Sequence, residues 1–270
     1  MGFRTTSMLV FLASCLSSCG GNLHSELRAQ VGGSECRYGA EAEISLDASA
    51  TDRLELTAGS GWRKVEGRRD LDQARATVRT CASDSEYLDE LEATLNREGS
   101  GIILETHYPD LSGFRFGNNV ARIDLVVEIP LVMAAAIDDS SGSMEVSGTG
   151  ALRIDDSSGS IDVRGITGSV SIDDSSGGVE VQDIAGDVEI DDGSGSIEFR
   201  DIDGRLRVRD NSGSIDVVDV RQNVIVERDG SGSINVRDVL GDFTVRRDGS
   251  GGIRHRNVEG RVQIPKGKRN

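Results

Sequence analysis

The chain is poor in aromatic, proline and histidine residues. Of its 270 residues, 4% are aromatic, three are proline and three are histidine, whereas 34 are glycine. A globular enzyme of this length usually carries more aromatic side chains, and so much glycine favours many tight turns. The length allows one or two domains with a sizeable core. The composition therefore predicts a turn-rich fold and speaks against an ordinary globular enzyme.

Positive charge is also scarce. The formal net charge of −16 disfavours nucleic acid, whose phosphates need a basic surface, so we expect no nucleic-acid partner. It suits solubility, cations or a basic partner. The charge is uneven, because residues 137–207 hold 17 acids and 5 bases while residues 208–270 hold 9 acids and 12 bases. This uneven distribution either favours self-association or has no function and reflects sequence drift on a solvent-exposed face.

The N-terminus has the features of an export signal. Arg4 precedes a short apolar stretch, "MLVFLASCL", which is too short to span a bilayer as a helix. The following "LSSC" (residues 16–19) resembles the bacterial lipobox, in which the cysteine is lipidated. We therefore expect a signal peptide at 1–18, lipidation of Cys19 and a tether at 19–35. An ordinary cleaved signal is the alternative. Either way the protein is exported, and a lipid anchor at Cys19 predicts an outer-membrane or periplasmic lipoprotein of the cell envelope.

Two cysteines remain in the mature chain, Cys36 and Cys81. In an oxidising compartment they are the only possible intramolecular pair, so we predict a disulfide between them. Two free thiols or an intermolecular bridge are the alternatives. The pair offers no metal-ligand spacing.

An internal repeat dominates the second half of the chain. Copies begin at Ile137, Ile154, Ile172, Ile190, Val208, Val226 and Val245, with a truncated eighth at Ile264, at spacings of 17, 18, 18, 18, 18, 19 and 19 residues. In each copy, β-branched residues two apart alternate with polar ones, and glycines separate these pairs. Each copy is thus two short strands and two turns, and only stacked copies can bury a continuous apolar face.

The repeat therefore predicts an all-β fold, a parallel β-solenoid with about 18-residue coils over residues 137–264. Seven coils at about 4.8 Å each span roughly 34 Å. Five inward columns account for 35 positions, all of them apolar except Thr149 and His255. We interpret both exceptions as residues of incompletely covered end coils. Residues 265–270 form a basic tail, "PKGKRN".

The preceding region, residues 36–136, is expected to form irregular β coils or a small β cap, with a separate β domain as the alternative. The segments 54–67 and 96–109 resemble the later coils in their glycines and spaced apolar residues. Residues 121–130 predict a strand that leads into the array. The segment "SDSEYLDEL" is the best helix candidate, with Ser83 and Glu86 at capping-box spacing.

One aspartate recurs at the same place in every copy, and a Ser-Gly pair follows it. We interpret it as a turn-capping residue whose carboxylate accepts backbone N–H bonds, while glycine supplies the dihedral angles of the turn. A row of calcium sites is the alternative, although the order of residues differs from known calcium-binding repeats. We assign no metal. The seven positions are Asp139, Asp156, Asp174, Asp192, Asp210, Asp229 and Asp248.

The acid before it, as in Asp155, gives way to Arg209 in the fifth copy. Adjacent side chains of a strand point to opposite faces, so the doubled Asp is not expected to be a catalytic carboxylate pair. A second outward column is acidic, and two residues further on the same face carries arginines; we expect weak lateral ion pairs between them. These two columns are Glu145, Asp162, Glu180, Glu198, Asp216 and Arg164, Arg200, Arg237, Arg256.

The sequence contains no recognised catalytic or cofactor-binding motif, so we expect no cofactor. It resembles the bacterial "putative adhesin" family of exported β-solenoids, through "LTAGSGWRKVEG", "EIPLVMAAAIDDSSGSMEV" and "GSGSINVRDVLGDFTV". The resemblance implies a surface or envelope role without a defined ligand, and it supplies no functional residues.

The leading hypothesis is a non-enzymatic envelope lipoprotein that presents a repetitive polar surface to an envelope protein, a glycan or a matrix component. One alternative is a polysaccharide-acting enzyme, since carboxylate-bearing β-helices include lyases and hydrolases. Such chemistry needs a localised acid/base pair, whereas these acids are spread evenly. The other alternative is a calcium-binding or self-assembling scaffold.

Overall fold

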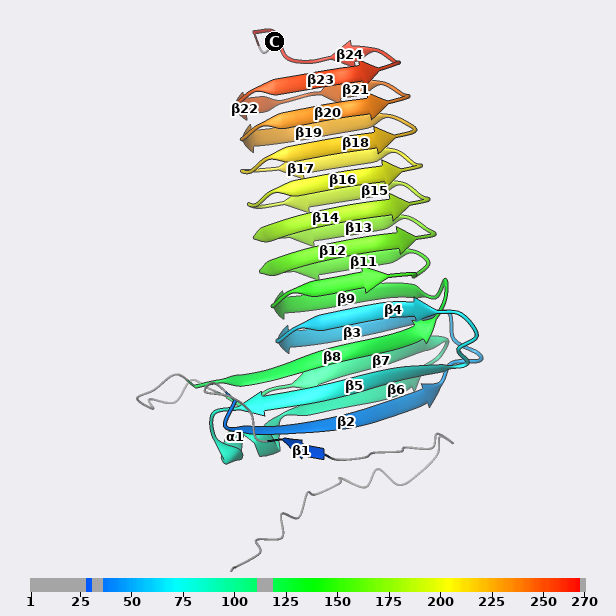
Figure 1. Cartoon of the computed structure of the whole chain (residues 1–270), viewed down its shortest axis with the longest axis vertical. Coiled ribbons are helices and arrows are strands. Elements are labelled where there is room, and N and C mark those ends of the chain that lie inside the picture. Colours follow the sequence, from blue (N-terminus) through cyan, green and yellow to red (C-terminus); the bar gives the residue numbers. More distant parts are fainter. Residues whose placement is uncertain (1–27, 31–35, 111–118, 268–270) are drawn as a thin grey trace, which may run out of the picture.

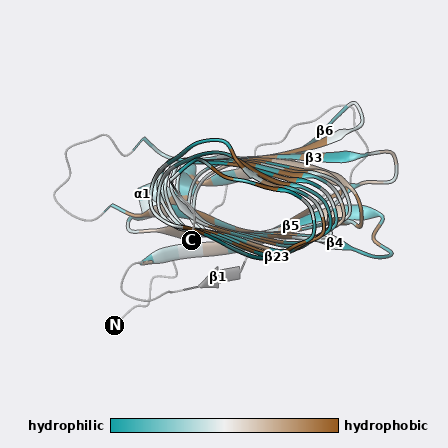
Figure 2. Cartoon of the chain, turned by 90° about the horizontal axis from the view of Figure 1, so that it is seen from above, coloured by the Kyte–Doolittle hydropathy of each residue, from teal (hydrophilic) through white to brown (hydrophobic). Residues whose placement is uncertain are grey.

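The structure is a computed structural model that describes residues 28–30, 36–110 and 119–267. In these residues the strands form two 12-stranded sheets that face each other along a tall, narrow stack (Figure 1). Seen along the stack, the successive coils superpose as a flattened oval (Figure 2). The predicted parallel β-solenoid is confirmed.

Each coil contributes one strand to each sheet. In one sheet the coil strands are β10 (Met144–Ser147), β12 (Gly159–Ile166), β14 (Gly177–Ile184), β16 (Ile197–Ile202), β18 (Ile215–Val220), β20 (Ile234–Val239) and β23 (Ile253–Val258). In the other they are β9 (Ala134–Ser141), β11 (Leu152–Asp156), β13 (Val170–Asp174), β15 (Val188–Asp192), β17 (Leu206–Asp210), β19 (Val224–Ser231), β21 (Phe243–Val245) and β24 (Val262–Gln263), with β22 (Asp248–Ser250) also paired to β19.

The strands pair in parallel, so each residue lies beside its equivalent in the next coil. Ile154, for example, lies between Ile137 and Ile172. The register shifts only where a coil lengthens: Val208 faces Val226 but Arg209 faces Arg228, so Glu227 is the inserted residue. The five inward columns supply most of a continuous core. In-register burial of β-branched side chains gives the stack its stability.

The coils continue below residue 137 in an order that differs from the order of the sequence. β3 (Arg53–Ser60) and β4 (Arg63–Arg68) form a coil directly beneath β9 and β10. β7 (Gly101–His107) and β8 (Ala121–Pro130) then lie beneath β3 and β4. The coil at 53–68 is therefore inserted between two coils that follow each other along the chain.

The link that climbs past this inserted coil, from β8 to β9, is strained. Val132 has a φ of 63°, in the left-handed region that β-branched residues avoid, and its side chain is exposed. Its N–H donates to Gly148 O at 3.3 Å. The chain thus accepts an unfavourable backbone conformation to bridge two coil heights.

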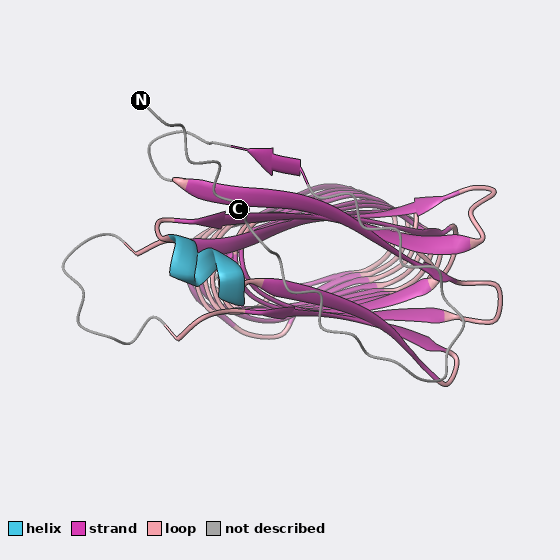
Figure 3. Cartoon of the chain, turned by 90° about the horizontal axis from the view of Figure 1, so that it is seen from below, coloured by secondary structure: helices cyan, strands magenta, loops and turns pink. Residues whose placement is uncertain are grey.

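Antiparallel strands close the N-terminal end of the stack. β2 (Tyr38–Asp47) pairs with β5 (Gln73–Ala82), β5 pairs with β8, and β6 (Glu92–Glu98) pairs with β7. β1 (Arg28–Gln30) pairs with the outer edge of β2. Figure 3 shows this end from below, with the helix beside the strands. The segment 96–109 is consequently a hairpin, and only its second strand, β7, joins the parallel stack.

The disulfide joins Cys36, just before β2, to Cys81 in β5, with 5.3 Å between the two Cα atoms. It therefore fastens the start of the described cap to a strand that pairs with β8. The predicted disulfide is present.

Two expectations from the sequence are wrong in detail. The helix α1 (Ser85–Glu90) is capped by Asp84, whose Oδ1 accepts the N–H of Glu86 at 3.1 Å, while the Ser83 hydroxyl instead accepts the N–H of Val120. Thr149 does not belong to an exposed end coil, because the coil at 53–68 covers it and its side chain is fully buried. His255, in contrast, does lie in the last strand of its sheet and is exposed.

Candidate functional site

The recurring aspartates form a buried column. From Asp139 to Asp229 each lies at or near the end of its strand in the second sheet, beside its equivalents in neighbouring coils, whereas Asp248 begins β22 and is half-buried. Alternation along the strand puts Ile154 inward, Asp155 outward and Asp156 inward. The aspartates from Asp139 to Asp229 are only 1–2% exposed. They are therefore a sixth inward column, made of carboxyl groups.

In the four middle members of the column, one carboxyl oxygen caps the turn, as predicted; no such bond is seen at Asp139 or Asp229 within the described residues. The Oδ1 atom accepts the backbone N–H of the serine two residues further on, as in an Asx turn. The four bonds are Ser158 N to Asp156 at 3.3 Å, Ser176 N to Asp174 at 3.1 Å, Ser194 N to Asp192 at 3.3 Å and Ser212 N to Asp210 at 2.9 Å. The column is thus tied to the Ser-Gly turn in successive coils.

The other oxygen has no backbone or cationic partner. The Oδ2 atoms of Asp156, Asp174, Asp192 and Asp210 are buried without a hydrogen-bond donor. Desolvation is the main cause that raises the pKa of every carboxyl from Asp139 to Asp229. It raises the pKa of Asp192 to about 7, with a further contribution from the charges of Asp174 and Asp210.

An arginine closes the lower end of the column. Arg63, in β4, stands in register with Met144 and so occupies an inward core position, where its side chain is fully buried. Its Nη2 lies 2.8 Å from Asp139 Oδ1, and its Nη1 donates to Ser141 O at 2.7 Å. In the same coil Ala58 takes the place of the aspartate. The column therefore begins with an ion pair.

The outer faces of the sheets carry charges in columns. Asp138, Asp155, Asp173 and Asp191 lie side by side and exposed on the second sheet. On the first sheet, Arg164 Nε lies 2.6 Å from Asp162 Oδ1, and its Nη2 lies 3.5 Å from Glu180 Oε1. The side chains of these ion pairs are between 33% and 54% exposed, so the pairs are weak. The expected lateral pairs are present at this position.

A further acidic column, which the sequence reasoning missed, lines one corner of the stack. Asp183, Asp201, Asp219 and Asp238 have φ between 55° and 59°, a left-handed conformation that aspartate tolerates better than most residues. They border a cavity of about 870 Å³. The signal in the sequence was an aspartate two residues after an apolar pair, as Asp201 follows Ile197 and Phe199 in "IEFRDIDG".

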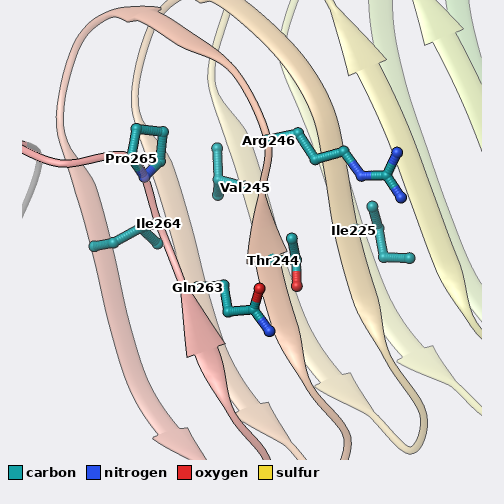
Figure 4. A pocket seen from close by; sticks show the side chains of 7 residues that line it. All are labelled: Ile225, Thr244, Val245, Arg246, Gln263, Ile264 and Pro265. Carbon is teal, nitrogen blue, oxygen red and sulfur yellow. The ribbon is translucent and has the colours of Figure 1, made fainter.

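The second hollow lies at the C-terminal end and is smaller, about 530 Å³. Figure 4 shows Ile225, Val245, Ile264 and Pro265 around it, together with Arg246. β21 and β24 are short here, so the last coils cover this part of the sheet incompletely.

Several expectations concern residues whose structure is not described. The signal peptide at 1–18, Cys19, most of the tether and the last three residues of the basic tail lie outside the described ranges. Within those ranges, no three His, Cys, Asp or Glu side chains are grouped to hold a metal ion. None of the described helical segments has the length and apolar character to cross a bilayer.

Neither a protein-family model nor a curated protein matches the chain. Several solved structures match it. A "putative cell adhesion protein" from Clostridium sporogenes is 13% identical, with 83% of this chain and 99% of that one covered and a TM-score of 0.39. A "putative adhesin" from Bacteroides fragilis is 12% identical, with 82% and 96% covered and a TM-score of 0.34. A "putative lipid binding protein" from Parabacteroides distasonis is 16% identical, with 84% and 97% covered and a TM-score of 0.43.

The chain is similar to structures named as adhesins.

Proposed function

We propose that the protein is a non-enzymatic, adhesin-like component of the bacterial cell envelope. It is anchored through lipid on Cys19 and presents the outer faces of its solenoid to an envelope protein, a glycan or a matrix component. The observation that carries the proposal is the in-register column of exposed carboxylates at Asp138, Asp155, Asp173 and Asp191. A rigid stack repeats this charge at the coil spacing of about 4.8 Å, which suits a partner with repeated polar groups.

The binding test removes charge from this column. A variant with Asp155, Asp173 and Asp191 changed to serine is expected to bind its ligand about tenfold more weakly, because three rim charges each contribute a few tenths of a kcal/mol or more. The readout is binding of the purified mature protein to a glycan array and to isolated envelope fractions.

The matched control is the variant Asp183→Asn, Asp201→Asn and Asp219→Asn, which loses the same charge at the other column. Asparagine keeps the left-handed backbone of these positions. Equal loss of binding in both variants would show that only the net charge matters. Unchanged binding in the serine variant would show that the column at Asp155, Asp173 and Asp191 is not the binding surface.

The anchorage test uses the full chain. A Cys19→Ser variant is expected to leave the membrane fraction and appear as soluble exported protein, since a single lipidated residue supplies the anchor. Mass measurement of the mature wild-type N-terminus should show an acylated Cys19. A mature chain that begins elsewhere, without lipid, would contradict the anchor while leaving the binding test intact.

A further inference from the structure

The buried aspartate column places carboxyl groups of successive coils side by side. Asp174 stands in register with Asp192, Asp192 with Asp210, and Asp210 with Asp229, and all four side chains are buried. Two ionised carboxylates are both acceptors and repel each other at this separation. Only a proton between them turns the contact into a hydrogen bond.

Among the described residues, the one cation that acts on the column lies at its lower end. Arg63 from β4 reaches Asp139 and acts electrostatically as far as Asp156. The other charged groups that act on the column are its own members and the exposed Asp155 and Asp173 on the same strands, which add negative charge. Beyond Asp156, no positive group of the described residues is among the causes of the raised pKa of these carboxyls.

We propose that this column is a proton-binding site, in which neighbouring buried carboxyl groups share protons at neutral pH and form a ladder of carboxyl–carboxylate hydrogen bonds along the solenoid. In Asp156, Asp174, Asp192 and Asp210 one oxygen holds the turn, and the other holds a proton shared with the next coil. The column thus adds hydrogen bonds between coils only while it stays protonated. This inference is independent of the outer surface and of any adhesin role.

The expected effect on stability has a definite sign. Burial, the charges of neighbouring aspartates and the hydrogen bonds between carboxyl groups raise the pKa of Asp192 and of Asp229 to about 7, and burial raises that of Asp174 to about 6. In the unfolded chain these groups titrate near their ordinary value of 3.8. Between these pH values the folded state holds more protons, so stability is greatest at the acidic side and falls as the pH rises towards 7.

One exposed group shifts in the opposite direction and does not reach this window. The backbone N–H and hydroxyl of Ser49 lower the pKa of Asp47, so its contribution is lost only at more acidic pH. The fall in stability between about pH 5 and 7 therefore reports the buried column.

The first experiment measures urea unfolding of the mature wild-type protein from pH 5 to pH 8. We expect the unfolding equilibrium constant to rise by about tenfold or more per pH unit up to about pH 7, since unfolding releases one or more protons. The Asp192→Asn variant keeps a turn-capping oxygen and is always neutral. Its unfolding should release about one proton fewer, so its unfolding constant should rise less steeply with pH. The control is Asp191→Asn, the exposed neighbour on the same strand, which should leave the slope unchanged.

The second experiment needs no variant. Infrared spectra of the folded protein at pH 7 should contain the C=O band of protonated carboxylic acid, and this band should disappear on unfolding, when the aspartates ionise. Absence of the band at pH 7, a wild-type stability that does not fall with pH, or equal slopes in the two asparagine variants would overturn the proposal.

Discussion

Gly177→Ala is expected to destabilise the solenoid by about 3–5 kcal/mol. Gly177 has a φ of 146°, in a region that is essentially restricted to glycine. A Cβ atom there would lie 1.5 Å from the carbonyl oxygen of Gly159 in the coil below. Since that oxygen belongs to the backbone of a packed turn, relief would require the two coils to separate.

The residue next to it provides the control. A Cβ atom on Gly178 would meet nothing closer than Ser196 O at 3.9 Å. Gly178→Ala should therefore be neutral or stabilise by up to about 1 kcal/mol, because alanine restricts the unfolded chain. Thermal or urea unfolding of the two variants separates the alternatives. Similar midpoints for both would show that the glycine column is dispensable.

Arg63→Met is expected to cost about 3–5 kcal/mol well above pH 7, where Asp139 is ionised in the native protein, since it removes the counter-ion of this buried carboxylate. The change also removes a donor from Ser141 O, as well as short contacts with the carbonyl oxygens of Gly59 and Gly61. The Arg63 guanidinium opposes the desolvation that raises the pKa of Asp139 to about 7. The loss should therefore shrink at acidic pH, where a protonated Asp139 needs no counter-ion.

Two further variants make this measurement specific. Arg68→Met, on the same strand but with a half-exposed side chain, should change the free energy of unfolding by no more than about 0.5 kcal/mol. The double variant Arg63→Met with Asp139→Ala should recover part of the loss, because it removes the orphaned charge. If Arg63→Met costs no more than Arg68→Met, the buried ion pair contributes nothing to the stack.

The regular coils could be predicted from the sequence because their information is local and repeated. Spaced β-branched residues define the two strands of a coil, and the constant interval between Ile154 and Ile172 defines the stacking. The same alternation implied that Asp156 faces inward with Ile154. The turn chemistry of an aspartate beside Ser-Gly, in contrast, says nothing about whether its side chain is buried.

The N-terminal part could not be predicted to the same extent. Alternation in residues 38–47 or 73–82 indicates strands, but it does not say which neighbours they pair with or in which direction. The residues around Arg63 have the pattern of an ordinary strand end, which predicts an exposed arginine. Its role depends on Asp139, 76 positions later in the sequence, and only the stacking of distant coils brings the two together.

The inserted coil at 53–68 also constrains the order in which the molecule can be built. The coil of β7 and β8 and the coil of β9 and β10 follow each other along the chain, but they cannot stack directly on each other. β3 and β4 lie between them, and the chain from β8 to β9 passes these two strands. Either the coil at 53–68 is folded before residues 134–141 pair with it, or the space between the two neighbouring coils must stay open until it inserts. A fragment that began at residue 137 would start with two bare sheet edges and with Asp139 deprived of Arg63. The inserted strands β3 and β4 thus hold the two neighbouring coils together. The link that passes them contains the strained backbone at Val132.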